Sequence, residues 1–362
     1  MNGRDVSVTF DGTSRHGEAM VFVLRFIDDH WIPQQRLVRL QMLAKTMCGE
    51  EIARELITTL STEISISPGR LLASMRDRVA SNGVAMRTLK IVYPTLLDIG
   101  CYSHTIDHVG ERFVTPVLEE FSKCWISLFA HSPHARLLWR EKTGRSMATY
   151  SETRWWSRWE VLKQVMQYFG DVLPFLQENG IAPANREKLL TILTDPHRSA
   201  RLHVELAVVI DVGEHFVRAT YSLEGDGALV FSCYETLSTI EAFIQTSHLP
   251  NTQAIIRRLS AGNTTSAQQL LQYAKECVEP GLTYFHHKFT EELSASVGAF
   301  KSARLFLPHK ISEMKPDASV VDSLQAFPFL NDAAVLHGLK QELPMYLAQA
   351  ADVAKDIEPL NW

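Results

Sequence analysis

The first third of the chain carries the periodicity of β-strands. Apolar and polar residues alternate over 5–11, with Val6, Val8 and Phe10 on one side and Asp11 on the other. A period of two predicts a strand with one buried face. Four further strands are predicted from dense apolar runs, and the first of them should pair antiparallel with 5–11. They cover residues 19–27, 31–43, 71–75 and 96–101.

Helical spacing separates the third and fourth of these strands, where Ile52, Leu56, Leu60 and Ile64 recur every four residues. From Thr105 onward the pattern is mostly helical. The expected helices cover residues 106–130, 154–178, 199–222, 235–247, 252–278, 281–306 and 332–355. This order predicts an α/β fold with a mixed five-stranded sheet, followed by a large, mostly α-helical insertion.

Composition changes this picture little. The chain has 362 residues, of which 46% are hydrophobic and 21% charged, as in an ordinary folded protein. It has no apolar run of the roughly 18 residues that cross a bilayer, so no membrane partner is expected. Five widely spaced cysteines fit a reducing compartment, which predicts an intracellular, soluble protein.

Charge is distributed unevenly along the chain. The net charge is −5, yet residues 1–160 carry 20 Lys+Arg against 18 Asp+Glu. Residues 136–159 hold six basic residues, two acidic residues and four tryptophans. This segment could be a nucleic-acid surface, or equally a solvated helix face with buried rings.

Two aspartates follow strand-like runs. Asp11 stands in Val-Thr-Phe-Asp-Gly-Thr, and Asp77 stands in Met-Arg-Asp-Arg-Val-Ala-Ser-Asn. Carboxylates from neighbouring strands could bind Mg²⁺ or Mn²⁺, and such ions support phosphoryl transfer. The alternatives are an Asp-Gly turn for Asp11 and an ion pair with a flanking arginine for Asp77.

Two other groups carry candidate chemistry. Cys101, His104 and His108 follow Cys-x-x-His-x-x-x-His, which could bind zinc if a fourth ligand joined them, or could be a buried thiol beside a helix-capping histidine. Arg154 and Trp155 pair a cation with a flat ring, which suits a phosphate and an unstacked base. The alternative is an amphipathic helix in which Trp155 belongs to the core, as we expect for Trp159 and Leu162.

In this order and at this spacing, Phe-Asp11-Gly-Thr, Arg-Asp77-Arg-Val-Ala-Ser-Asn, Cys101-x-x-His104 and Thr-Arg154-Trp155 resemble the landmarks of hAT-family DNA transposases. The family's second motif often reads Asp-x-Ala-Ser-Asn, so this chain has one additional residue there. The resemblance covers roughly residues 5–165. It implies a ribonuclease-H-like core over 1–165, and a helical insertion domain with the start of a C-terminal segment over 166–362.

The resemblance also implies roles for single residues. Asp11 and Asp77 would be metal-binding and catalytic carboxylates, and His104 would be catalytic as well. Cys101 and His104 would line the active site beside the scissile DNA strand, and Arg154 and Trp155 would contact the DNA end. The third carboxylate of the family normally follows in a Ser-Glu-Arg context. Glu342 and Glu358 lack this context.

Three hypotheses follow. The first is a nuclear, transposase-derived DNA-binding protein that is expected to be truncated at both ends and catalytically incomplete, with weakened self-association. The second is an active metal-dependent DNA strand transferase whose third carboxylate comes from the helical region, for example Glu313 or Glu342. The third is a non-enzymatic nuclear interaction scaffold that keeps only the fold.

Overall fold

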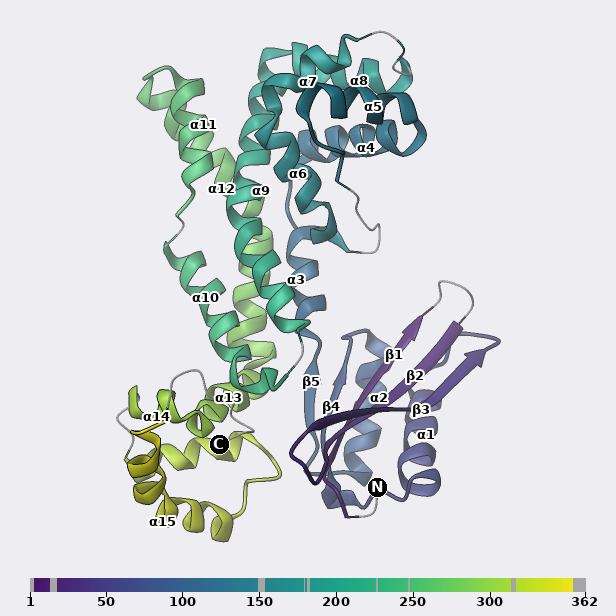
Figure 1. Ribbon diagram of the computed structural model, residues 1–362, viewed down its shortest axis with the longest axis vertical. Helices are drawn as coiled ribbons and strands as arrows, with labels where there is room; N and C mark the ends of the chain where they lie inside the picture. Colours follow the sequence, from purple (N-terminus) through teal and green to yellow (C-terminus); the bar gives the residue numbers. More distant parts are fainter. Residues whose placement is uncertain are drawn as a thin grey trace. The chain divides into compact units, whose positions relative to one another are not determined.

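The computed structural model describes residues 3–13, 18–148, 154–178, 180, 183–225, 227–246, 248–313 and 317–353. The chain forms two compact units (Figure 1). The first contains Met1–Thr105, Leu223–Leu237 and Lys288–Trp362, and the second contains Ile106–Ser222 and Ser238–His287. Each unit is therefore assembled from segments that are far apart in the sequence.

All strands of the described chain belong to one sheet in the first unit. They are β1 (Val6–Thr13), β2 (Glu18–Ile27), β3 (Pro33–Leu43), β4 (Leu71–Arg76) and β5 (Leu97–Gly100). The strand order is β3-β2-β1-β4-β5. β2 is antiparallel to β1 and β3, whereas β1, β4 and β5 run parallel. The mixed five-stranded sheet expected from the sequence is confirmed.

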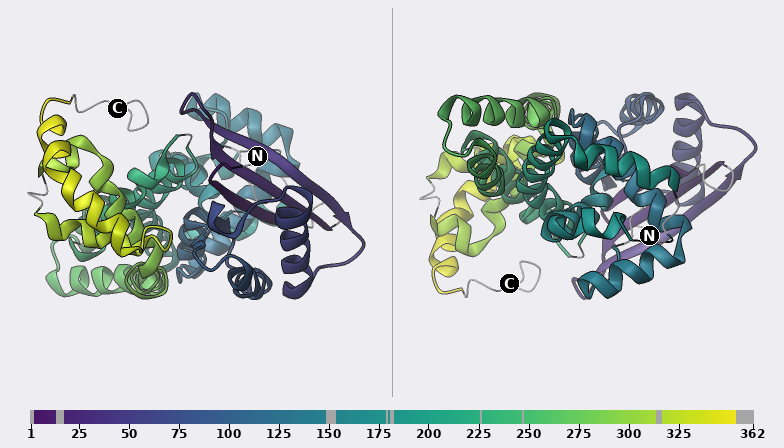
Figure 2. Two further views of the ribbon diagram at one scale, coloured as in Figure 1. Left: turned by 90° about the horizontal axis from the view of Figure 1, so that it is seen from below. Right: turned by 90° about the horizontal axis from the view of Figure 1, so that it is seen from above.

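One face of the sheet packs on helices α1 (Gly49–Ile57) and α2 (Ala80–Val92), which lie on the same side of it (Figures 1 and 2). The alternation along β1 explains this, because Val6, Val8 and Phe10 are at most 2% exposed. They share a core with Leu56 and Leu89 of the two helices. Ser7, Thr9 and Asp11 must then lie on the opposite face.

That opposite face is covered at β4 and β5 by the last helices of the first unit. Leu97 shares a second core with residues such as Ala299, Leu305 and Leu336. The helical segments that contribute are α13 (Ser294–Ala303), η6 (Arg304–Phe306), α14 (Pro308–Glu313), η7 (Ala318–Ala326) and α15 (Ala333–Ala350). Segment η5 (Lys288–Glu292) precedes them. The shorter segments η1 (Thr58–Glu63), η2 (Pro68–Arg70) and η4 (Leu229–Phe231) complete the unit.

The second unit is helical throughout its described part. Trp125 and Trp139 are fully buried there, and Phe129 and Phe175 pack against them with ring centroids 4.9–5.7 Å from Trp125. Its elements are α4 (Pro116–His131), α5 (Pro133–Thr143), η3 (Trp155–Arg158), α6 (Trp159–Gln167), α7 (Phe169–Leu176), α8 (Pro183–Thr194), α9 (Pro196–Leu223), α11 (Pro250–Ser260) and α12 (Thr264–His287). Helices α3 (Tyr102–Glu111) and α10 (Cys233–Thr246) contribute residues to both units.

The helical character expected after the fifth strand is confirmed, with differences in where helices end. The expected helix 106–130 is divided at Pro116, where α4 begins. The expected break before residue 281 is wrong, because α12 continues through Pro280 and Gly281 to His287. The expected domain boundary at residue 165 falls inside the second unit. No helix in the described ranges has the length and apolar character to cross a membrane.

Candidate functional site

Asp11 is exposed near the end of β1, on the sheet face that α1 and α2 do not cover. The backbone N–H of Gly12 donates to Asp11 Oδ1 at 2.8 Å. Asp11 and Gly12 are both ladder residues of β1, paired with Val21 and Met20 of β2. The Asp-Gly pair is therefore part of the strand, and the alternative of a turn at this pair is wrong.

Asp77 follows β4 directly and is held at both its main chain and its side chain. Arg76 Nη1 donates to the Asp77 carbonyl oxygen at 3.0 Å. Asn82 Nδ2 donates to Asp77 Oδ1, and the Val79 N–H lies 3.4 Å from the same oxygen. Arg76 forms a bidentate pair with Asp98, and Arg78 Nη2 lies 3.8 Å from Glu292 Oε2. Among the described residues, neither arginine forms the ion pair with Asp77 that the sequence offered as an alternative.

The register of β1 and β4 relates the two aspartates. Val8 is paired with Ser74 and Thr9 with Met75 in the parallel ladder. Thr9 and Met75 are the last pair of this ladder, and Asp11 and Asp77 each lie two residues beyond it. Neighbouring strands are about 4.8 Å apart, and residues two positions apart share a face. Asp11 therefore lies on the outer face within β1, whereas Asp77 lies just past the end of β4, where Asn82 of α2 donates to its carboxylate.

This pair has the donor chemistry of a hard divalent cation. Mg²⁺ is commonly bound through one or two carboxylates, with water completing its six oxygen ligands. Asp11 and Asp77 fit such a partial site. No group of three or more His, Cys, Asp or Glu side chains suited to a metal occurs among the described residues. The pair would supply two protein ligands to such an ion.

Cys101 and His104 lie at the adjoining end of β5. The Cys101 N–H donates to the Arg76 carbonyl oxygen at 2.7 Å, so the β4–β5 pairing continues to this residue. Because Gly100 is level with Arg76, Cys101 is level with Asp77. His104 is partly buried in the first turns of α3. His108 Nδ1 lies 2.5 Å from Glu111 Oε2, so this histidine pairs with a carboxylate of its own helix.

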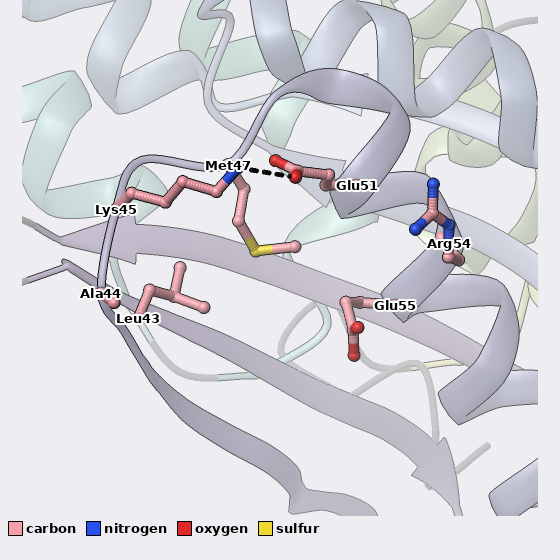
Figure 3. A pocket seen from close by; sticks show the side chains of 7 residues that line it. All are labelled: Leu43, Ala44, Lys45, Met47, Glu51, Arg54 and Glu55. Atoms are coloured by element: carbon pink, nitrogen blue, oxygen red, sulfur yellow. Dashed lines mark hydrogen bonds and ion pairs between the residues drawn. The ribbon is translucent and has the colours of Figure 1, made fainter.

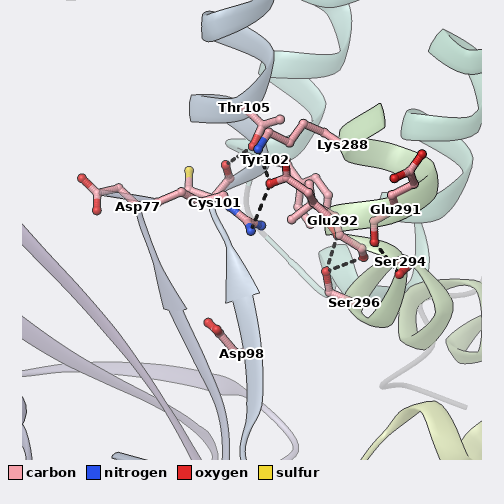
Figure 4. A network of polar contacts seen from close by, with 12 residues as sticks. Asp77, Asp98, Cys101, Tyr102, Thr105, Lys288, Glu291, Glu292, Ser294 and Ser296 are labelled. Carbon is pink, nitrogen blue, oxygen red and sulfur yellow. Dashed lines mark hydrogen bonds and ion pairs between the residues drawn. The ribbon is translucent and has the colours of Figure 1, made fainter. Parts of the chain in front are cut away.

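A network of polar contacts surrounds these strand ends (Figure 4). Arg78 Nη2 lies 3.8 Å from Glu292 Oε2, and Lys288 also forms an ion pair with Glu292. Tyr102 and Ser296 share a hydrogen bond of 2.6 Å between their hydroxyl oxygens. The Asp77 side chain points away from this network in Figure 4. Glu292 is thus a carboxylate near the strand ends that spacing along the sequence did not reveal.

The sequence offered Glu313, Glu342 and Glu358 as residues to compare with the third carboxylate of the family. Glu342 is exposed on α15. The side chain of Glu313 and the whole of Glu358 lie outside the described residues, as do residues 151–153 of the Ser-Glu-Thr-Arg-Trp-Trp run. None of these positions adds a described ligand to the pair.

Trp155 belongs to the second unit and is only 9% exposed. A Cβ on Gly110 would lie 2.2 Å from its ring, so α3 needs a glycine at this position to pack against it. The Phe113 ring packs edge-on against the Trp155 ring, with the two centroids 5.5 Å apart. The Arg158 guanidinium lies 5.1 Å from the Trp155 centroid. A base could stack on Trp155 only after this cover is displaced.

The start of η3, beside Arg154, is held by Asp107 of α3. The Trp156 N–H donates to Asp107 Oδ1 at 3.2 Å, and Trp156 Nε1 donates to the Ile106 carbonyl oxygen at 2.8 Å. Burial raises the pKa of Asp107 above its ordinary range, although hydrogen bonds from the Trp156 and Trp155 main-chain N–H groups lower it. Arg154 itself is exposed. The Arg-Trp pair therefore has an outward cation and an inward ring.

The other residues of the basic and aromatic segment show the same division. Arg136 and Arg140 are exposed on α5, whereas Trp139 of that helix is fully buried. Trp159 and Leu162 are 8% and 1% exposed, so their expected place in the core is confirmed. The surface that this segment offers to a ligand is basic rather than aromatic.

One hollow of the described surface lies on the sheet, away from Asp11 and Asp77. It has a volume of about 270 Å³ and is lined by residues of β3 and α1 and the segment between them (Figure 3). Three of its charged side chains form ion pairs, with Lys45 Nζ 3.0 Å from Glu51 Oε1 and Glu55 Oε2 2.6 Å from Arg39 Nη2. It adds nothing to the carboxylate pair. The lining residues are Leu43, Ala44, Lys45, Met47, Glu51, Arg54 and Glu55.

Comparison of the sequence with models of known protein families and with curated proteins finds no match.

Proposed function

We propose that this chain is a DNA-binding protein of the hAT transposase type, with a ribonuclease-H-like sheet in its first unit. The observation that carries the proposal is the parallel pairing of β1 and β4, whose last pair, Thr9 and Met75, lies two residues before Asp11 and Asp77. The strand order β3-β2-β1-β4-β5, with β2 antiparallel to its neighbours, is the arrangement expected of a ribonuclease-H-like sheet. The helical second unit begins just after β5, where the resemblance expects an insertion.

In this proposal Asp11 and Asp77 hold Mg²⁺ or Mn²⁺ beside the DNA backbone. A bound ion would activate water and stabilise the leaving oxygen in phosphoryl transfer. Cys101 and His104 line the same strand ends. Exposed arginines of the second unit, such as Arg136 and Arg140, would contact phosphates, which supply most of the affinity in DNA binding that is independent of sequence.

Catalytic strength depends on how many carboxylates reach the ion. The described pair supplies two, so we propose that these residues alone support DNA binding better than strand cleavage. Active strand transfer is the alternative. Cleavage of a labelled duplex in Mn²⁺ by the wild-type chain, lost in Asp11→Ala, would favour that alternative. Glu292→Gln and Glu342→Gln would then show which further carboxylate contributes.

A non-enzymatic nuclear scaffold remains the second candidate, and the buried ring of Trp155 favours it. Under this candidate, Asp11 and Asp77 do not bind a metal ion. Asp11→Asn would leave binding of a protein partner unchanged, and DNA affinity would be as weak as for any protein of similar charge.

Fluorescence anisotropy with a labelled duplex that carries a single-stranded flank tests the proposal. The double substitution Arg136→Glu/Arg140→Glu should weaken binding by about tenfold or more and flatten the salt dependence. The matched control is Arg87→Glu/Lys90→Glu, which reverses two exposed charges on α2. Equal losses in both double variants, or an affinity that salt does not change, would contradict specific use of the α5 surface.

A further inference from the structure

Asn82 is a buried polar side chain in the first turn of α2, with 4% of its surface exposed. A buried amide requires hydrogen-bond partners, because leaving it unpaired costs about 1–3 kcal/mol. Its Nδ2 donates to Asp77 Oδ1 across the three-residue connection between β4 and α2. Asn82 lies in the second aspartate motif, yet spacing alone does not reveal this contact.

The main chain of Asp77 is fixed independently from the other side. Arg76 is 9% exposed, and its Nε and Nη2 atoms lie 3.1 and 2.9 Å from the carboxylate oxygens of Asp98. With its guanidinium held in this way, Arg76 Nη1 donates to the Asp77 carbonyl oxygen at 3.0 Å. Arg76 thus fixes the main-chain carbonyl of Asp77, and Asn82 of α2 fixes the orientation of its carboxylate.

We propose that Asn82 is a positioning residue for the Asp77 carboxylate. By occupying Oδ1, it leaves Oδ2 as the oxygen that faces a divalent cation shared with Asp11. This inference rests on the proposed function, because it requires that the aspartate pair binds metal. Partners of ligating carboxylates commonly change metal affinity by about 10- to 100-fold when they are removed.

Mn²⁺ affinity, measured by electron paramagnetic resonance on the full chain, tests the inference. Asn82→Ala and Asn82→Leu both remove the donor, and leucine also keeps the volume of the buried site. Each should weaken Mn²⁺ binding by about 10- to 100-fold. The neighbouring Ser81→Ala is the matched control and should bind like the wild type.

Two results overturn the inference in different ways. If folded Asn82→Leu keeps wild-type Mn²⁺ affinity while Asp77→Asn loses it, the metal site is real but Asn82 does not position it. If Asp77→Asn itself binds Mn²⁺ as tightly as the wild type, or the wild type binds none, the metal site of the proposed function fails, and the role of Asn82 fails with it.

A second measurement keeps the inference testable if the Asn82 variants do not fold. In the wild-type chain, the side-chain amide NMR signal of Asn82 should move when Mg²⁺ is added. Asn251 is an internal control, since its Nδ2 donates to Asp211 Oδ1 at 2.7 Å in an unrelated pair. A stationary Asn82 signal, beside a moving backbone signal of Asp77, would overturn the inference.

Discussion

At the scale of single residues, buried carboxylates join the helices of the second unit. Glu205 of α9 is fully buried, accepts the Leu118 N–H at 2.7 Å at the start of α4, and accepts the Tyr273 hydroxyl of α12. Burial raises the pKa of Glu205 above its ordinary value of 4.5, although the hydrogen bonds lower it. Asp211 caps α11 in a similar way through Asn251 and Thr252.

The pKa of Glu205 makes stability depend on pH. Because its folded-state pKa is raised, its contribution to stability is fully present below 4.5 and is lost as pH rises through the folded value. Glu205→Gln removes this titration. The wild type should therefore lose unfolding free energy relative to Glu205→Gln between about pH 5 and about pH 8. Urea unfolding of both proteins at the two pH values measures this difference in unfolding free energy. A wild type that becomes more stable than Glu205→Gln as pH rises would contradict the account.

Gly281 shows how closely α12 approaches α3. A Cβ at this position would lie 2.4 Å from the Val109 carbonyl oxygen and 2.5 Å from the Phe113 ring. Gly281→Ala should therefore lower the free energy of unfolding by about 1–3 kcal/mol, as overpacking does. Gly338 on α15 is the control, since nothing lies within 4 Å of its Cβ position. Gly338→Ala should be neutral or stabilising by up to about 1 kcal/mol. Equal effects of the two substitutions in urea unfolding would count against the close approach.

Residue patterns predicted the inner face of β1 but not the contacts of its neighbours. Val6, Val8 and Phe10 follow from alternation alone. The bond between Asn82 and Asp77 depends on the path of a short connection, which no periodicity specifies. The same holds for Glu292, which is near the strand ends only because a distant segment packs there.

At the scale of elements, strands were easier to predict than helix ends. Alternation and apolar runs located all the strands of the described chain, because each strand needs one buried face. The expected helices 252–278 and 281–306 were separated at residues 279–280. The buried face of α12, formed by Ala274, Cys277 and Phe285, continues past them. Tertiary packing outweighs the local cost of a proline within the helix.

β3 is an edge strand with an apolar outer surface. Leu37, Leu40 and Met42 are 61%, 60% and 66% exposed. Exposed apolar edges promote self-association. Leu40→Lys should lower self-association in light scattering and change unfolding free energy by no more than about 0.5 kcal/mol. Gln35→Lys, on the same strand, adds the same charge without removing apolar surface. If both variants reduce association equally, charge rather than the apolar edge is responsible.

At the scale of the whole molecule, the position of a segment along the sequence does not show which unit it belongs to. Periodicity indicated where helices form, but it could not show that Lys288–Trp362 belongs with the sheet. That assignment comes from the core shared by Leu97, Ala299 and Leu336. Net charge is equally uninformative, because the exposed arginines of α5 lie in a chain whose total is −5.

The metal-binding pair is the central claim, and Mn²⁺ titration followed by calorimetry tests it most directly. The wild-type chain should bind Mn²⁺, and Asp11→Asn and Asp77→Asn should each weaken binding by about tenfold or more, since each removes a ligand. Asp5→Asn is the control, because Asp5 is an exposed carboxylate paired with Arg70 at 2.9 Å. Retained affinity in both Asp11→Asn and Asp77→Asn would contradict the account.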